Sequence, residues 1–200
     1  MRQVVLIIMS ALCGFSAVVQ ANTEQVTTDQ DSTWYLAVGR VSLDEKAAAS
    51  EAVKDDANYF RLGWQRRSDA FVFGLGLSSY IYKDRAGFSQ EVEDYFGDVS
   101  TEDSSATSFN LFGELGYSHP LSSMVRLELV TGFELVLSSE RSINNCSDCY
   151  SEDIDLDSGA YIMPRVLLQT EKGFTAGLAY QHFINGDVEK GPSLVLGWSY

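Results

Sequence analysis

Charged and amide side chains recur at every second position of several apolar segments, where they could form a buried polar network. In the segment 124–138, written MVRLELVTGFELVLS, every charge lies on one side of the alternation and Leu129 and Phe133 lie on the other. Matching positions in other segments extend the polar set to Arg61, Gln65, Asn110, Glu114, Arg126, Glu128, Glu134, Arg165 and Gln169. Unpaired charges are costly in a narrow interior, so the Arg and Glu residues are expected to pair there. The set predicts a polar plug, with a narrow conduit for small solutes, opened by rearranging ion pairs, as the alternative.

Two closely spaced cysteines, Cys146 and Cys149, are the clearest covalent feature. In an exported protein such a pair favours a disulfide. The acidic neighbours Asp148 and Glu152 oppose a stabilised thiolate, which a redox role would need. Two thiols without a nearby histidine make a poor zinc site. The sequence therefore predicts a Cys146–Cys149 disulfide, with no metal and no cofactor.

The chain is strongly acidic, with 28 Asp and Glu against 14 Lys and Arg and a formal net charge of −14. Nucleic-acid binding depends on Lys and Arg, so nucleic acid is not an expected partner. The stretch Asp153-Ile-Asp155-Leu-Asp157 is similar to the start of a calcium loop, but Ser158 and Pro164 stand where such a loop needs Gly and Glu. Alternating carboxylates on a strand extension are the favoured interpretation, and weak calcium binding there stays open.

The elements that position these residues are β-strands, because a period of two places alternate side chains on opposite faces. Segment 124–138 is long for a strand, since a typical one has about 5–6 residues. A tilted strand of about 9–11 residues can cross a bilayer. The same alternation predicts eight strands, at residues 33–41, 58–67, 70–83, 106–118, 124–138, 158–170, 174–184 and 191–200.

The connections between these strands alternate in length. Short turns join the second strand to the third, the fourth to the fifth and the sixth to the seventh, and longer acid-rich segments make the other connections. In an up-and-down meander, alternate connections lie at opposite ends. The pattern therefore predicts one end with tight turns and one with long loops, as in outer-membrane barrels.

The two faces of the strands differ in size as well as polarity, which decides between a membrane barrel and a soluble one. A lipocalin-like barrel would turn its apolar face inward. Here the apolar face carries Trp64, Phe73 and Trp198, whereas the other carries Gly63 and Gly132. Bulky residues suit the wide outside and glycines the crowded inside, so the apolar face is expected to meet lipid. Sheet closure follows, because an open edge would leave unpaired backbone groups in hydrocarbon. Aromatic belts are expected from Trp34, Tyr80, Tyr82, Tyr180 and Tyr200.

The chain begins with a stretch typical of a secretory signal peptide. Residues 1–21 combine Arg2, an apolar run and a small-residue site ending at Ala21. A lipoprotein alternative at Cys13 is weakened by the residues before it. No later segment is apolar for long enough to make a transmembrane helix. The expected organisation is a signal peptide at 1–21, a short periplasmic leader at 22–32 and an outer-membrane barrel at 33–200.

The last residues, LVLGWSY, place Leu194, Leu196, Trp198 and Tyr200 at alternate positions and end on an aromatic residue. Together with the eight predicted strands, this ending resembles the small eight-stranded outer-membrane barrels, the OmpA transmembrane domain and the OmpX/Ail group. The resemblance implies an all-β, eight-stranded antiparallel up-and-down transmembrane β-barrel in a Gram-negative outer membrane, recognised by the barrel-assembly machinery through this C-terminal signal. It also implies a monomeric structural or surface-interaction protein in contact with outer-membrane lipids and lipopolysaccharide. Any extracellular ligand stays unidentified, since loops would carry it.

A lipid-modifying enzyme is a further alternative, because lipid A acylases and deacylases use barrels of this size. Hydrolysis there needs a nucleophile activated by a neighbouring base. Of the two histidines, His119 falls in a predicted periplasmic turn, and His182 lies in QHFIN, which distantly resembles the deacylase His-x-Ser-Asn pattern. Ile184 stands where the serine nucleophile would be. The sequence therefore predicts that the protein is not an enzyme.

Overall fold

The strands close into one antiparallel ring. The computed structural model describes residues 30–93, 99–143 and 149–200. Within these residues, neighbouring strands follow the order β4-β5-β3-β2-β1-β10-β9-β8-β6-β7, and an additional β5–β6 pairing closes the sheet. The ring therefore consists of eight strands, which confirms the predicted fold class. The predicted signal peptide at 1–21 lies outside the described residues, and β1 already begins within the predicted leader, at Gln30.

The ring strands are longer on one side of the molecule than on the other. Their bounds are β1 Gln30–Leu43, β2 Val53–Ser68, β3 Phe71–Asp84, β5 Val99–Pro120, β6 Val125–Ile143, β8 Ala160–Gln169, β9 Phe174–Phe183 and β10 Val188–Ser199. The chain termini of the ring meet where β1 pairs with β10, with Trp34 opposite Trp198 and Leu36 opposite Leu196. Each predicted strand is present, and most extend beyond their predicted bounds into the connecting segments.

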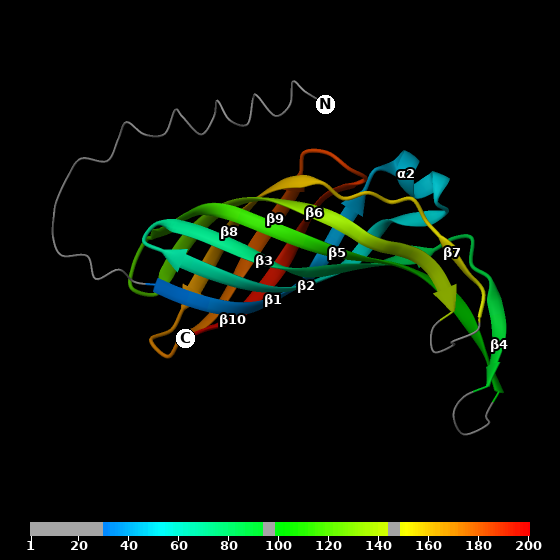
Figure 1. The fold of residues 1–200 in the computed structure, drawn as a ribbon, viewed down its shortest axis with the longest axis horizontal. Coiled ribbons are helices and arrows are strands. Elements are labelled where there is room, and N and C mark those ends of the chain that lie inside the picture. The colour runs from blue at the N-terminus through cyan, green and yellow to red at the C-terminus, as the bar shows by residue number, and fades with distance from the viewer. Residues whose placement is uncertain (1–29, 94–98, 144–148) are drawn as a thin grey trace.

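Three of the short turns lie at one end of the barrel (Figure 1), whereas the short β9–β10 connection at residues 184–187 lies at the end with the long loops. The β2–β3, β5–β6 and β8–β9 turns share the first end with the C-terminus, and α2, β4 and β7 lie at the other. The predicted asymmetry of the connections is therefore present. The long connections contain structure that the alternation did not predict: α2 (Glu45–Ser50), β4 (Ser89–Glu93) and β7 (Ser151–Asp153). Helix α2 begins after Asp44, whose side chain accepts hydrogen bonds from the backbone N–H groups of Lys46 and Ala47.

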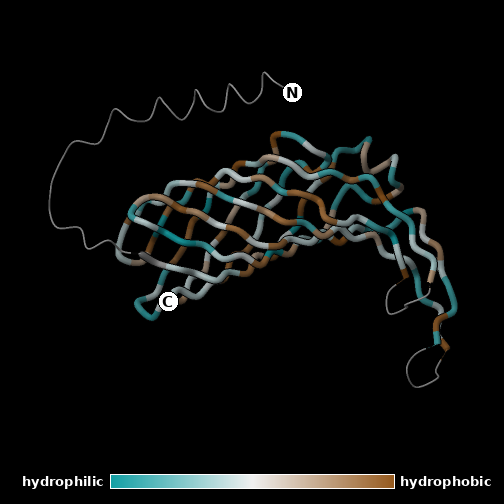
Figure 2. Tube along the Cα trace, in the orientation of Figure 1, coloured by the Kyte–Doolittle hydropathy of each residue, from teal (hydrophilic) through white to brown (hydrophobic). Residues whose placement is uncertain are grey.

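Alternation along each strand sorts side chains to the two faces of the ring, and the tube in Figure 2 changes accordingly between hydrophilic and hydrophobic along the strands. The outward face is bulky and apolar: Phe71 is 72% exposed, Leu178 66% and Leu129 56%. The inward face is buried and includes Arg61, Glu114 and Glu134. Within the described residues, no helix is long and apolar enough to cross a membrane.

One sequence expectation about the aromatic residues is wrong. Tyr80 and Tyr82 were expected in an outer aromatic belt, but they are buried, at 1% and 3% exposed. Both tyrosines lie on the inward face of β3, whereas Leu77 and Ile81 lie on its outward face. Trp34, Tyr180 and Tyr200 do lie on the exposed outer face. The tyrosine hydroxyl explains the difference, because it finds a buried partner inside the barrel: Tyr80 donates to Glu134 and Tyr82 pairs with Ser108.

Candidate functional site

The centre of the lumen is organised around the carboxylate of Glu114 on β5. It accepts hydrogen bonds from Arg61 Nη1 at 2.5 Å and from Arg165 Nη2 at 2.5 Å. It also accepts from the hydroxyls of Tyr161 at 2.9 Å and Tyr35 at 3.3 Å. Both carboxylate oxygens are therefore used, and a buried charge with such partners is stabilised where an unpaired one would not be.

Each of the two tyrosines that reach Glu114 has a glycine opposite it on the adjacent strand, and this glycine makes room for the ring. Tyr35 on β1 lies opposite Gly63 on β2, and Tyr161 on β8 lies opposite Gly132 on β6. A Cβ atom at Gly63 would come within 2.6 Å of the Tyr35 ring, and one at Gly132 would collide with the Tyr161 ring. Each ring therefore crosses the face of a glycine toward the middle of the barrel. This Tyr-over-Gly arrangement fixes the direction of both hydroxyls.

The guanidinium group of Arg61 joins Glu114 to a second carboxylate nearer the long loops. Arg61 Nη2 pairs with Glu134, which also accepts from the Tyr80 hydroxyl at 2.5 Å and from Gln181 at 3.4 Å. The Arg61 Cζ atom lies 4.0 Å from the centre of the Phe112 ring and 4.9 Å from that of Tyr161. Cation–π contacts of this kind stabilise a desolvated arginine, so Arg61 is held by charge and by ring stacking at once.

A third carboxylate, Glu128, anchors the part of the network nearer the short turns. It accepts from Arg67 Nε at 2.7 Å and from Gln65 Nε2 at 3.2 Å. Gln65 in turn accepts from Arg165 Nη1 at 2.8 Å, which connects this cluster to Glu114. Arg67 also donates to Thr33, and Thr33 pairs with Ser199 at 2.7 Å. The described lumen thus balances three buried arginines against three buried glutamates.

The structure brings most of the predicted polar set into this network and places three members apart from its centre. Asn110 is buried but donates to Ser78 and Ser108, on the β3 and β5 wall. Arg126 is half-buried near the short turns and donates to Ser118 at 3.2 Å. Gln169 lies at the same end and donates to Ser199 at 3.5 Å. These residues belong to the rim and wall of the lumen.

Several functional side chains were missed because the prediction selected charges and amides alone. Arg67 stands two positions after Gln65 on β2, so continuing the alternation by one step would have included it. Tyr35, Tyr80, Tyr161 and Gln181 also occupy inward positions of their strands. The period of two carried the signal for all of them, but the tyrosines were interpreted as membrane-interface residues or left out.

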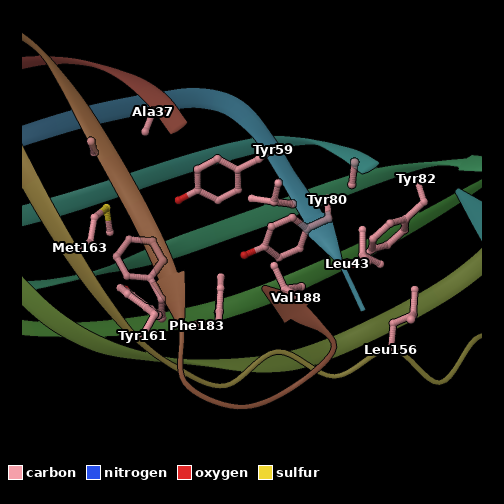
Figure 3. Close-up of a cluster of buried hydrophobic side chains, with 14 of the residues drawn as sticks. Ala37, Leu43, Tyr59, Tyr80, Tyr82, Leu156, Tyr161, Met163, Phe183 and Val188 are labelled. Carbon is pink, nitrogen blue, oxygen red and sulfur yellow. The ribbon is translucent and has the colours of Figure 1, made fainter. Parts of the chain in front are cut away.

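Above the polar network, at the end with the long loops, apolar side chains from the strand ends and the loops are buried together. Leu43, Val53 and Val188 are at most 2% exposed, and Ile154 and Leu156 are 5% and 3% exposed. Figure 3 shows Leu43, Val188 and Leu156 on the far side of Tyr80 from Tyr59, with Tyr59 and Tyr80 stacked at 5.4 Å between ring centres. Because Ile154 and Leu156 point inward, the alternating Asp153, Asp155 and Asp157 are exposed. We name the buried set Leu43, Ala48, Val53, Ile154, Leu156 and Val188 the apolar cap.

One arginine ties the loops of the apolar cap together. Arg141, near the end of β6, pairs through Nε with Asp84 at 2.9 Å and through Nη1 with Glu152. Its Nη2 donates to the backbone carbonyl of Glu51, at the end of α2. Asp84 also accepts from Ser104 at 2.6 Å. Arg141 therefore links the segments around α2, β3 and β7 directly through charge-assisted bonds, and β5 joins them through the bond from Ser104 to Asp84.

The remaining predicted sites lie at the ends of the strands. Leu194, Leu196, Trp198 and Tyr200 are exposed on the outer face of the C-terminal strand. Cys149 is disulfide-bonded, and Cys146 lies outside the described residues, so the Cys146–Cys149 pairing stays a prediction. His119 and His182 are both exposed. Among the described residues, no group of three or more His, Cys, Asp or Glu side chains is placed to hold a metal ion.

The comparisons with known proteins found structures with a similar fold but no matching sequence family. No family model and no curated protein matches the chain. A crystal structure of Ail, the attachment invasion locus protein of Yersinia pestis, in complex with the heparin analogue sucrose octasulfate, matches with a TM-score of 0.48 and 11% identity over 86% of this chain and 97% of Ail. A second Ail structure matches with a TM-score of 0.42 and 12% identity over 86% and 99%. Ail belongs to the group that the sequence resembles, and at this identity the likeness concerns the fold alone.

Proposed function

We propose that this chain is an outer-membrane β-barrel that spans the bilayer with a sealed interior and acts as a structural or surface-interaction protein. The observation that carries the proposal is the reversed placement of polarity. Large apolar side chains such as Phe71 and Leu115 are exposed around the ring, and Arg61, Glu114 and Arg165 are buried inside it. In water, such a surface would be one large exposed apolar patch that promotes aggregation. In a bilayer it is the ordinary outer face of a closed barrel.

We infer the orientation from the asymmetry of the ends, and the export route from residues 1–21 and the C-terminal pattern. Short turns face the periplasm and long loops the cell exterior in barrels of this kind. The chain is then exported through a signal peptide at 1–21, and the outward residues Leu194, Leu196, Trp198 and Tyr200 of the last strand serve as the signal for the barrel-assembly machinery. The finished barrel is a monomer surrounded by outer-membrane lipids and lipopolysaccharide.

A sealed lumen is favoured over a solute conduit because two independent layers fill it. The polar layer pairs every buried arginine of the described lumen with a glutamate, through Glu114, Glu128 and Glu134. The apolar cap covers that layer on the side of the long loops. Eight-stranded barrels have interiors just wide enough for such filling.

The acidic loop end supports a role in contact with cations or basic partners. Asp44, Asp155, Asp157 and Asp187 surround a surface depression there that also includes Lys46. A field of one sign attracts divalent ions, which would bridge the loops to lipopolysaccharide phosphates, and basic protein surfaces. The same field opposes a polysulfated ligand of the kind that Ail is seen to bind. A lipid-modifying enzyme is the less favoured role, since Ile184 occupies the nucleophile position near His182.

Fractionation with a heat-modifiable gel shift tests the membrane assignment. The mature protein should sediment with outer membranes and migrate faster unheated than boiled, because the closed barrel resists detergent. A soluble periplasmic product without a shift would refute it.

Conductance in planar lipid bilayers tests the sealed lumen. The purified mature barrel should give no reproducible single-channel steps, and a variant that weakens the apolar cap, Leu156→Asn, should stay closed as long as the polar layer is intact. Large, regular steps from the wild-type protein would favour the conduit.

A further inference from the structure

Between Phe109 and Tyr117, the outer face of β5 has a gap in its bulky apolar surface at Gly113. The other outward residues of this stretch, Phe109, Leu111, Leu115 and Tyr117, are 41–61% exposed large side chains. A Cβ atom added at Gly113 would meet nothing within 4 Å, unlike one at the inward glycines Gly63 and Gly132. A glycine inside a strand costs stability, and where no side chain crowds it, it often marks a place that a ligand approaches closely.

The missing side chain opens a groove of about 360 Å³ on the lipid-facing surface. Phe73, Leu115 and Phe133 form its walls, and Gly113, Glu114, Thr131 and Gly132 form its floor. The Glu114 carboxylate itself is buried in the lumen, where it pairs with Arg61 and Arg165. The Phe73 ring packs edge-on against Trp64, with ring centres 6.3 Å apart, so this wall is held in place by a neighbour outside the groove. The Thr131 hydroxyl donates to the carbonyl of Tyr161 at 3.1 Å, which leaves its methyl group to the groove. The groove is therefore apolar and shaped before anything enters it.

The groove lies in the middle of the strands and extends toward the short turns. Phe73, Leu115 and Thr131 are paired with one another in register across β3, β5 and β6. Gly113 pairs with Phe133 one row nearer the long loops. In the orientation proposed above, this places the groove in the periplasmic leaflet, at the depth of acyl chains.

We propose that this groove binds one acyl chain of a glycerophospholipid from the periplasmic leaflet. The inference rests on the proposed membrane location. The groove is continuous with the apolar outer surface that lipid would cover. Its one hydroxyl, on Thr131, already donates to the Tyr161 carbonyl. Its position along the strands corresponds to the depth of acyl chains in the bilayer and not to that of headgroups. Because the groove walls are already held in place, an acyl chain forms its contacts there at a smaller cost in conformational freedom than on a flat surface. A chain in the groove is therefore bound longer than the surrounding lipid.

Photo-crosslinking in vesicles tests this site. The mature full-length barrel is reconstituted into phosphatidylethanolamine and phosphatidylglycerol vesicles that contain a trace of phosphatidylethanolamine with a mid-chain diazirine, and adducts are mapped by peptide mass spectrometry. Adducts should be several-fold more frequent on Phe73, Leu115 and Phe133 than on outward residues of the opposite wall such as Leu178 and Leu196. Gly113→Leu, whose Cβ atom would meet nothing within 4 Å, places a side chain in the groove from its floor and should lower the adducts on these walls to the general level.

The matched control is Ala176→Leu, which adds bulk to the outward surface of β9, where Ala176 pairs with the exposed Leu196. This variant should keep the wild-type distribution. Adducts spread evenly over all outward residues, unchanged by Gly113→Leu, would overturn the groove while leaving the membrane barrel intact. Absence of adducts from the whole outer face would overturn the proposed membrane location itself.

Discussion

The substitution Glu114→Gln tests whether the lumen network stabilises the barrel as a unit. The amide keeps one acceptor oxygen but replaces the other by a donor, which faces the donating groups of Arg165 and Tyr35. Arg165 then retains Gln65 at 2.8 Å and a distant Glu128 at 3.8 Å, so the lumen carries an excess positive charge. Removing one partner of a buried ion pair costs about 3–5 kcal/mol. The loss of two charge-assisted hydrogen bonds, at roughly 1.5–3 kcal/mol each, gives a similar figure.

The assay is equilibrium unfolding in detergent or bilayers, followed by tryptophan fluorescence and by the unheated gel shift. The exposed carboxylate Glu91 on β4 supplies the control, and Glu91→Gln should change the free energy of unfolding by less than about 0.5 kcal/mol. The double variant Glu114→Gln with Arg165→Met removes both charges and should be less destabilised than the sum of the two single variants. A loss below about 1 kcal/mol for Glu114→Gln, which is the range of an exposed pair, would refute the reasoning.

Three further predictions test the outer face, the loops and the cysteines. Leu129→Arg places a charge on the outward face of β6, one row nearer the short turns than Thr131. Its cost should exceed about 1 kcal/mol and approach the roughly 2–4 kcal/mol of a midplane position, whereas Leu121→Arg in the β5–β6 turn should cost at most about 1 kcal/mol, as measured by unfolding in bilayers. Equal effects would mean that the apolar face does not meet lipid. Arg141→Met should raise hydrogen exchange in α2 and β7, because it releases Asp84, Glu152 and the Glu51 carbonyl. The control Arg85→Met breaks an exposed pair with Asp55 at 3.7 Å and should leave this exchange unchanged. Intact-mass measurement with and without reductant should reveal the Cys146–Cys149 disulfide in the mature protein, and free thiols before reduction would contradict it.

The alternation in residues 124–138 was sufficient to predict the strand and to place Glu128 and Glu134 on the face opposite Leu129, because successive side chains point to opposite faces whatever surrounds the strand. Which of the two faces is inside does not follow from the alternation, and the glycines on the polar face of the neighbouring strands supplied that prediction. The alternating connection lengths and the glycines on the inward face then predicted a closed barrel with an apolar exterior. These are properties of single strands and their order, and they are readable from one sequence.

The partners inside the lumen depended on the closed ring. Arg61 and Glu134 are far apart in the sequence, and no local rule says that they meet above Phe112. Tyr80 and Tyr82 show the limit most clearly. An amphipathic ring suits both a membrane interface and a buried position with a hydroxyl partner. The alternation of β3 indicates the inward face for both tyrosines, but only the strand pairing brings Glu134 and Ser108 within reach of their hydroxyls.

The long connections were the least predictable part, because loops have no periodicity and their structure comes from contacts between them. Their acidity was visible in the sequence, but the inward turn of Ile154 and Leu156, and the bonds from Arg141 to three separate segments, exist only once the barrel brings the loop ends together. The sequence by itself thus determined which residues of each strand share a face, since that follows from a two-residue period, and the glycines on the polar face indicated that the bulky apolar face is the outer one. The tertiary structure alone decided which buried charges pair and how the barrel is capped, since those contacts join residues that are distant along the chain.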